Sequence, residues 1–300
     1  MTSPFKRVAI IGASGSIGKI VLDGLVASSQ FTITVVSRKE SVASFPQLVT
    51  VLRPEFSEAG LEAAFKDQDV VISTVGAAGF GEQKKFVDAA LRAGVKRFIP
   101  SEFSVSSLNS AVLQLLPLFG QKKELIEYLK TKEAEGLSWT GIATSGLFDW
   151  GLQNKFLGFD IANRTATIWD SGDKIFTLTN EKELKQSVVS VLQHPDETRN
   201  RYLYVASVET TQREILAALE KAQGANWAVT ETTTELQVSE GFEKLGAGDF
   251  SGAFSLVRAT VFGNTPGLCS NYAKETELAN EVLGLKLESI ETTVQRIVSG

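Results

Sequence analysis

The sequence has very few of the residues that form disulfides and bind transition metals. It contains one cysteine, Cys269, and one histidine, His194. A disulfide within the chain is therefore excluded, and so is a zinc site made of cysteine and histidine ligands. A hydrolase with a serine–histidine–aspartate triad would have to use His194 as its base. That histidine lies in the tract Gln193-His194-Pro195-Asp196, which is typical of a polar helix end, so we assign it no catalytic role.

Long apolar runs, charge blocks, repeats and low-complexity linkers are also absent. No apolar run reaches the roughly 18 residues that a membrane span requires. The formal net charge of -5 argues against general nucleic-acid binding, which usually needs a basic face. The first expected strand starts at Arg7, which leaves no room for a signal peptide before it. We therefore expect a cytoplasmic protein that binds neither nucleic acid nor a membrane, as a monomer or a homodimer.

A strand, a glycine-rich turn and a helix follow one another near the start of the chain. Residues 8–11 are all apolar, as in a strand buried on both faces of a parallel sheet, and a helical apolar period starts at Ile17. The glycines between them allow a sharp turn, close approach of a pyrophosphate, and close packing of the helix on the strand. The helix N-terminus then faces the phosphates with free N–H groups. We predict dinucleotide binding by Gly12, Ser14, Gly15, Ser16, Ile17 and Gly18; a purely structural turn is the alternative.

Basic residues follow the second expected strand, residues 31–36, about 20 residues after the last glycine of the turn. An enzyme that uses NAD usually has an acidic side chain there, which holds the ribose 2′-hydroxyl. Arg38 instead suits a 2′-phosphate, which a guanidinium can bind through two hydrogen bonds, and Ser37 would assist it. We therefore predict NADP(H) as the cofactor. A solvated basic turn is the alternative.

Strands and helices alternate through the first half of the chain. The apolar patterns predict further strands at residues 48–52, 69–76, 95–100 and 137–143, with helices at 61–65, 82–93 and 118–135 between them. This alternation predicts an α/β fold with a doubly wound, parallel Rossmann sheet. We assign residues 1–150 to an NADP-binding Rossmann domain and residues 151–300 to a smaller α+β substrate-binding domain.

The pattern is weaker in the second half. We predict a hairpin with strands at residues 166–169 and 174–177, and a strand at 201–206 that returns to the large sheet. Residues 144–152 are expected to form a loop. The expected helices lie at residues 181–193, 211–223, 250–262, 276–283 and 290–298, and Gly300 caps the last of them.

Ligands of such sheets bind beyond the carboxyl ends of the strands. We therefore predict that the nicotinamide lies near Thr74, Val75, Gly76, Gly146, Leu147 and Phe148. The substrate pocket is expected to be lined by Phe80, Ser101, Phe103 and Trp150, with the ring of Phe148 adding to a flat apolar wall. For the aromatic residues, a plain core position is the alternative.

Lys122 is the candidate catalytic residue. On a helical wheel with roughly 100° per residue, it falls at the centre of the apolar face formed by Leu125, Ile126 and Leu129. Burial disfavours the charged form of a lysine, and the positive end of the helix dipole adds to this effect. We therefore expect a lowered pKa that suits proton transfer. The alternative is a lysine whose stem lies along the first helical turn and whose amine reaches solvent.

Tyr128 and Lys132 form a competing pair, because their spacing matches the Tyr-x-x-x-Lys pattern of ordinary short-chain dehydrogenases. Both lie off the centre of the apolar face and farther than Lys122 from the ligand edge of the sheet, so we favour Lys122. The position at the usual spacing before Lys122 is Leu118 rather than a tyrosine. A substrate hydroxyl or a water molecule would have to complete the proton relay.

Two stretches resemble a known family. The turn Gly12–Gly18 and the block Val95-Lys96-Arg97-Phe98-Ile99-Pro100-Ser101-Glu102-Phe103 resemble the NmrA-like and isoflavone-reductase-like branch of the atypical short-chain dehydrogenases. Residues 136–140 and 146–152 extend the similarity, in a form like that of fungal members. The resemblance implies a catalytic lysine at the position of Lys122. In plant relatives it implies an enone or a quinone-methide-like substrate.

Three functions are compatible with these residues. The leading hypothesis is an NADPH-dependent oxidoreductase that reduces a small aromatic or conjugated metabolite by hydride transfer, with Lys122 as acid/base. The second is a redox sensor that binds NADP(H) and a partner protein without turnover, although a sensor has no need of a desolvated lysine. The third is a redox-neutral cyclase or isomerase that uses the same pocket.

Overall fold

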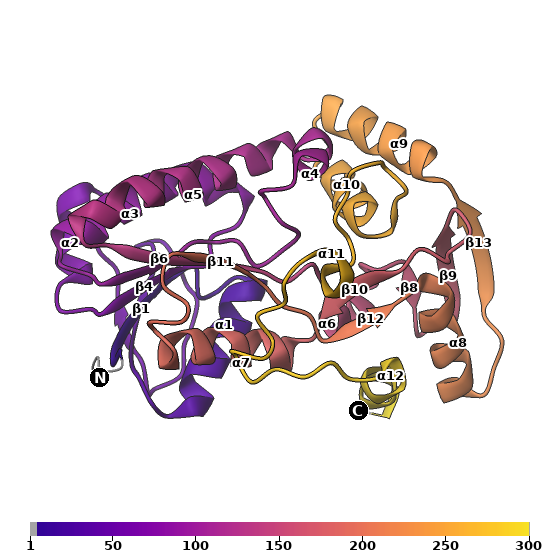
Figure 1. Cartoon of the computed structure of the whole chain (residues 1–300), viewed down its shortest axis with the longest axis horizontal. Helices are drawn as coiled ribbons and strands as arrows, with labels where there is room; N and C mark the ends of the chain where they lie inside the picture. The colour runs from indigo at the N-terminus through magenta and orange to yellow at the C-terminus, as the bar shows by residue number, and fades with distance from the viewer. Residues whose placement is uncertain (1–4, 300) are drawn as a thin grey trace.

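The large sheet of the first lobe consists of parallel strands only. The computed structural model describes residues 5–299, in which seven strands form this sheet in the order β3-β2-β1-β4-β5-β6-β11 (Figure 1). Every neighbouring pair is parallel, and Ile11 at the end of β1 lies opposite both Val36 and Ser73. The carboxyl ends of the central strands therefore share one edge. The strands are β1 Arg7–Ile11, β2 Thr32–Val36, β3 Thr50–Leu52, β4 Val70–Ser73, β5 Arg97–Ile99, β6 Ser138–Ala143 and β11 Arg201–Tyr204.

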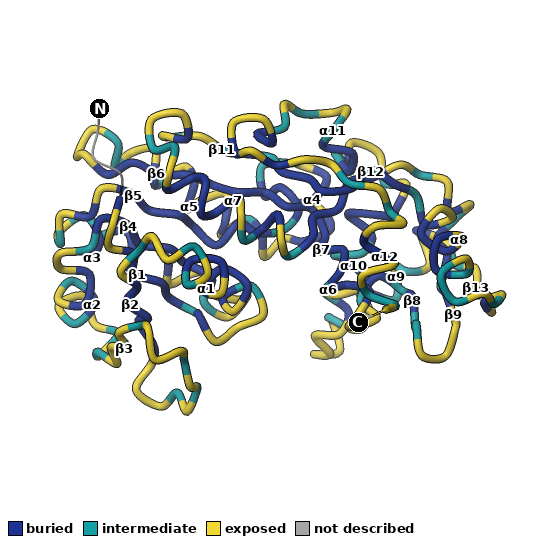
Figure 2. The backbone as a smooth tube through the Cα atoms, turned by 90° about the horizontal axis from the view of Figure 1, so that it is seen from below, coloured by how far each residue is buried: buried dark blue, intermediate teal, exposed yellow. Residues whose placement is uncertain are grey.

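Helices cover both faces of this sheet, and its central strands β1 and β4 are buried apart from Arg7 at the start of β1 (Figure 2). Val8 and Ile10 pack in the core beneath α1 and α7, whereas Ala9 and Ile11 pack in the core beneath α2, α3 and α5. The predicted doubly wound Rossmann fold is confirmed. The helices are α1 Ser16–Ser28, α2 Glu58–Phe65, α3 Gln83–Arg92, α5 Gly120–Lys132 and α7 Glu181–Gln193, with the short 3-10 helices η1 Ala77–Glu82, η2 Pro117–Phe119 and η3 Glu133–Glu135. None of the helices in residues 5–299 is both long and apolar enough to cross a membrane.

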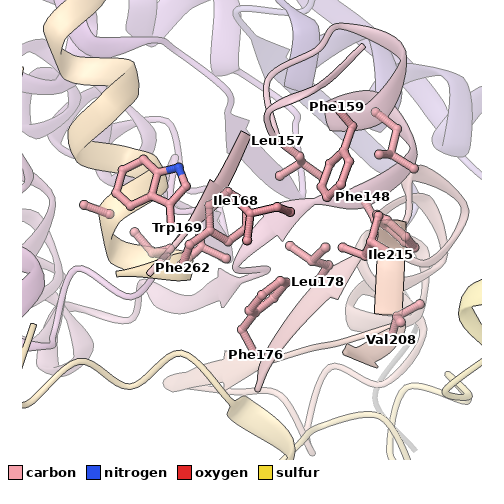
Figure 3. Close-up of a cluster of buried hydrophobic side chains, with 14 of the residues drawn as sticks. Phe148, Leu157, Phe159, Ile168, Trp169, Phe176, Leu178, Val208, Ile215 and Phe262 are labelled. Atoms are coloured by element: carbon pink, nitrogen blue, oxygen red, sulfur yellow. The ribbon is translucent and has the colours of Figure 1, made fainter. Parts of the chain in front are cut away.

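The second lobe contains two sheets of three strands each, in the orders β12-β10-β7 and β13-β9-β8. Its core is rich in aromatic side chains, and Figure 3 shows Phe148, Phe159 and Phe176 within one buried cluster. The strands are β7 Gly146–Leu147, β8 Phe159–Asp160, β9 Thr165–Trp169, β10 Phe176–Thr179, β12 Val208–Thr210 and β13 Ala228–Thr232. The helices are α4 Ser110–Leu115, α6 Phe148–Gln153, α8 Gln212–Gln223, α9 Thr234–Gly246, α10 Ser251–Phe262, α11 Tyr272–Glu275 and α12 Ile290–Ser299.

The chain passes between the lobes more than once. α4 belongs to the first half of the sequence but packs against α10 in the second lobe. After β10 the chain returns, so that α7 lies beside α1 and β11 pairs with β6, at the strand expected for residues 201–206. Each lobe therefore contains segments from both sides of the proposed division at residue 150.

Three predictions for the second half are wrong. The strands around residues 166–169 and 174–177 form no hairpin: β9 pairs with β8 and β13, whereas β10 pairs with β7 and β12. The carboxylate of Asp170, in the expected turn, instead accepts hydrogen bonds from Thr234 and Asn264, which ties that turn to α9. The helix expected at 276–283 is absent, since α11 ends at Glu275, and the expected loop 144–152 contains β7 and α6. Gly300 lies outside the described residues.

A buried arginine ties together the amino ends of two central strands. Arg97, the first residue of β5, is 2% exposed and donates hydrogen bonds to the hydroxyls of Ser138 (2.7 Å) and Thr140 (2.8 Å) in β6. It also donates to the backbone oxygen of Pro195 at 2.7 Å, in the segment between α7 and β11. Burial lowers the pKa of this guanidinium to about 10. Arg97 therefore holds three segments of the first lobe together at the edge opposite the expected ligand site.

Candidate active site

The turn between β1 and α1 brings two stretches of backbone unusually close. Gly12 has a φ of +84°, and a Cβ atom at this position would lie 2.8 Å from the backbone oxygen of Thr74. A Cβ atom at Gly18 would lie 2.1 Å from the backbone oxygen of Gly12. Only glycine fits either position without a shift of the backbone. The turn leaves Ser14, Gly15 and Ser16 exposed at the start of α1, where the helix presents N–H groups to an anion.

A cleft of about 460 Å³ lies between this turn, the end of β2 and η1. It is the right size for part of a dinucleotide. The structure brings eight of the predicted cofactor residues together in its lining: Gly12, Ser14, Gly15, Ser37, Arg38, Thr74, Val75 and Gly76. Ser16, Ile17, Gly18, Gly146, Leu147 and Phe148 do not line it. The cofactor roles of all these residues stay predictions.

The aromatic residues Phe45 and Phe56 also line this cleft and were not predicted from the sequence. Both are half-buried and lie in segments without regular structure, where no periodic pattern distinguishes them. The ring of Phe56 packs edge-on against Phe86 of α3, with 6.1 Å between the ring centroids. Phe45 and Phe56 therefore add apolar rings to the lining of the cleft.

The residues after β4 and β5 are fixed by hydrogen bonds to neighbouring strand ends. The hydroxyl of Thr74 donates to the backbone oxygen of Ile11 at 2.8 Å, and that of Ser101 donates to the backbone oxygen of Val75 at 2.7 Å. Both side chains are buried. Their hydroxyls therefore hold the ligand edge of the sheet in place, and the predicted role of Ser101 in substrate binding is untested.

Lys122 lies near the start of α5 and is 3% exposed. Its amine donates hydrogen bonds to the backbone oxygen of Glu102 (2.8 Å) and to the hydroxyl of Ser104 (3.0 Å). The rings of Phe80 and Phe119 lie 4.7 Å and 4.4 Å from it, so the amine is enclosed by aromatic rings and neutral oxygens. Burial lowers its pKa to about 8, against the opposing effect of the Glu102 carboxylate. The burial and the lowered pKa are as predicted, while the acid/base role stays a prediction.

The competing pair has a different environment. The hydroxyl of Tyr128 donates to Asp88 of α3, and the amine of Lys132 pairs with Glu135 at 2.9 Å. α5 connects β5 to β6, so it starts at the ligand edge of the sheet and ends at the opposite edge. Lys132, its last residue, is therefore far from the cleft. These contacts account for Tyr128 as a hydrogen-bond donor and for Lys132 as an ion-pair partner.

The four aromatic residues expected to form one wall are divided between two cores: Phe80 and Phe148 belong to the second-lobe core, and Phe103 and Trp150 belong to the core beneath α1 and α7. The ring of Phe148 is fully buried in the second-lobe core with Leu157 and Phe159, so its predicted place in the pocket wall is wrong (Figure 3). The ring belongs to α6, of which Phe148 is the first residue. Phe103 is buried in the core beneath α1 and α7, and Trp150, half-buried beside that core, packs against Phe156. Phe80 alone lies against Lys122.

The fold and the cleft define a class of protein: a Rossmann-fold dinucleotide binder whose nucleotide cleft lies next to a buried lysine. Comparison with known families is more specific. The family model described as the NmrA-like family matches residues 4–263. The chain therefore belongs to the NmrA-like family, which confirms the resemblance seen in the turn and in the block at residues 95–103.

Relatives of similar length and fold support this assignment. The chain is 35% identical over 297 residues to Oxidoreductase aprR of Aspergillus flavus, covering 98% of this chain and 99% of that protein. It is 32% identical over 289 residues to Oxidoreductase poxI of Penicillium oxalicum, with 95% and 92% covered. Among solved structures, AtPrR2 with NADP+ and (+)pinoresinol has a TM-score of 0.78 at 20% identity, covering 98% of this chain and 99% of that one. The ternary complex of leucoanthocyanidin reductase from Vitis vinifera has a TM-score of 0.77 at 17% identity, with 98% and 100% covered.

Proposed function

We propose that this protein is an NADPH-dependent oxidoreductase that reduces a small aromatic or conjugated metabolite. The observation that carries the proposal is the position of η1. Its residues Ala77–Gly79 line the nucleotide cleft, while Phe80 of the same short helix packs against the amine of Lys122. The cleft and the candidate proton donor therefore contact consecutive residues of one short helix. The fungal relatives named oxidoreductases, and the reductase structures with NADP+ or NADPH, support the same function.

The residues of the cleft fit NADP(H). The close backbone approach at Gly12 and Gly18 leaves room for a pyrophosphate at the start of α1, and the exposed guanidinium of Arg38 suits a 2′-phosphate. Phe45 and Phe56 offer an apolar wall for the adenine. When bound, the cofactor supplies a hydride to an electrophilic carbon of the substrate.

Lys122 provides the proton in this proposal. Its ammonium gives a proton to the substrate oxygen as the neighbouring carbon is reduced, and the neutral amine then regains a proton from water. The surroundings of Lys122 favour this, because an amine with a pKa of about 8 exchanges protons near neutral pH far more readily than an ordinary lysine. Phe80 and Phe119 cover the amine and contribute to the burial that lowers its pKa.

The test is to follow NADPH consumption and product formation together. Metabolites of the source organism with and without the gene are compared first, because the compound that accumulates without it is the candidate substrate. The purified protein should then oxidise one NADPH per product formed. Product without NADPH oxidation would replace the proposal by a redox-neutral cyclase or isomerase.

We also propose that the protein works in a reducing compartment such as the cytoplasm. Its single cysteine, which forms no disulfide within the chain, supports this proposal.

A further inference from the structure

Glu102 follows β5 at the ligand edge of the sheet and carries a buried carboxyl group. The residue is 2% exposed. One carboxyl oxygen, Oε2, accepts hydrogen bonds from the hydroxyls of Ser107 (2.8 Å) and Tyr202 (2.7 Å). The other, Oε1, is buried and has no hydrogen-bond partner among residues 5–299. The group is thus only half satisfied, which is costly for a carboxylate with a purely structural role. Burial raises the pKa of this carboxyl, whereas the charge on Lys122 and the hydrogen bonds from Tyr202 and Ser107 favour its ionised form.

The same residue holds the amine of Lys122 through its backbone. The oxygen that accepts the 2.8 Å hydrogen bond from Nζ is the backbone carbonyl of Glu102. In the described part of the chain, the carboxylate of Glu102 makes no direct ion pair with the amine of Lys122. The carboxylate therefore acts on that amine through space. The titratable groups that face Glu102 are Lys122 of α5, Tyr202 of β11 and Tyr272 of α11. Of these, Lys122 is the one that carries a positive charge.

We propose that Glu102 is a positioning residue for the reaction: its backbone holds the amine of Lys122, and its buried negative charge keeps that amine protonated until the substrate takes the proton. The inference rests on the proposed function. A glutamine at this position could accept the same two hydrogen bonds from Ser107 and Tyr202 without the cost of burying a charge. What a glutamine lacks is the charge, which raises the pKa of Lys122 while burial lowers it.

The first experiment measures the titration of Lys122 directly, by side-chain NMR of protein with isotope-labelled lysine, in wild type, Glu102→Gln and Glu124→Gln. Lys122→Met identifies the resonance. We expect a lower titration midpoint in Glu102→Gln, so that the neutral fraction of Lys122 at neutral pH rises by about threefold or more. The matched control Glu124→Gln removes an exposed carboxylate from the same helix, where water and salt screen its charge, and its midpoint should stay close to that of wild type. An unchanged midpoint in Glu102→Gln overturns the proposal.

A second measurement covers the case in which Glu102→Gln does not fold. Infrared spectra of protein with isotope-labelled glutamate report whether a buried carboxyl is ionised. The spectrum of Lys122→Met minus that of wild type should show a new signal of a protonated carboxyl at neutral pH, because the variant removes the compensating charge. The subtraction cancels the signal of Glu183, which is also buried, and Glu102→Gln, where it folds, assigns the remaining signal. A protonated Glu102 in the wild type would overturn the proposal. Neither measurement depends on turnover, so the two proposals can fail separately. Full activity of Lys122→Met would refute the acid/base role of Lys122. The NMR and infrared results would still show whether the charge of Glu102 acts on Lys122.

Discussion

At the scale of single residues, the proposed chemistry depends on the amine of Lys122. Methionine is of similar length and apolar, so Lys122→Met keeps the contacts with Phe80 and Phe119 while it removes the proton donor. Loss of a general acid typically slows a reaction by a factor of about 10² to 10⁴, and we expect a loss in kcat of that order. NADPH affinity should change by a few-fold at most, because Lys122 does not line the nucleotide cleft.

The matched control is Lys123→Met, since Lys123 is the exposed neighbour in the same helix. Steady-state kinetics and NADPH titration of the two variants provide the comparison. Turnover by Lys122→Met at the wild-type rate would transfer the proton donor to the substrate or to another residue.

The pH dependence of the reduction follows from the same amine. A proton donor must be charged, and burial lowers the pKa of Lys122 to about 8. The rate constant kcat/KM should therefore be high below this pH and fall as pH rises through it. The profile is measured with the wild-type enzyme at saturating NADPH. A rate that instead rises through this range would indicate that the neutral amine acts as a base.

We expect Arg38 to decide between the two nicotinamide cofactors. Its guanidinium is exposed at the rim of the cleft, where a 2′-phosphate would be held by charged hydrogen bonds. Such bonds contribute about 1.5–3 kcal/mol, so Arg38→Ala should weaken NADPH binding by roughly ten- to a hundredfold. NADH binding should change little. Lys39→Ala serves as the control, because Lys39 is adjacent and pairs with Glu55. Equal losses for both cofactors in Arg38→Ala would show that another residue holds the phosphate.

At the scale of elements, the β1–α1 turn has no room for a Cβ atom at Gly12 or Gly18. A methyl group at Gly18 would meet the backbone of Gly12, which cannot rotate away as a side chain could. Gly18→Ala should lower the free energy of unfolding by about 1–3 kcal/mol. Gly120→Ala is the control: its added Cβ atom meets nothing within 4 Å, so this helical substitution should leave stability unchanged or raise it slightly. Urea unfolding of both variants tests the contrast.

Elements with a strong local pattern were predictable from sequence, and pairing partners were not. The apolar runs at β1 and β4 and the helical period of α7 lie close to their predicted positions, because burial on both faces or on one face writes a regular period into the sequence. β9 and β10 also have strand-like sequences. However, two of their partners, β13 and β7, lie far away along the chain, and no local signal identifies them.

The same distinction holds for the site. Gly12, Arg38 and Lys122 carry signals in their residue type and spacing, so they could be named from sequence. Phe45 and Phe56 lie in irregular segments, and the ring of Phe148 turns into a core formed mostly by later residues. The partners of Glu102 come from three separate segments, and only the folded chain reveals them.

At the scale of the whole molecule, the two lobes depend on each other. A fragment of residues 1–150 would lack α7 and β11, which exposes the edge of β6 and the apolar core beneath α1. We expect this fragment to aggregate, or to retain helical circular dichroism without fixed tertiary structure. The full chain, under the same conditions, should show a well-defined near-ultraviolet spectrum. Cooperative unfolding of the fragment would demonstrate an independent first domain.

The block at residues 95–103 contains β5 and runs from the amino edge of the large sheet to its carboxyl edge. Arg97 at its start fastens three segments by hydrogen bonds, and Glu102 near its end touches the amine of the candidate acid. One short stretch of chain thus contains both a residue that holds the fold together and a residue that contacts the candidate acid. A protein that has lost its reaction would still need the first half of that stretch to fold, so the stretch identifies a relative more securely than it identifies an active enzyme.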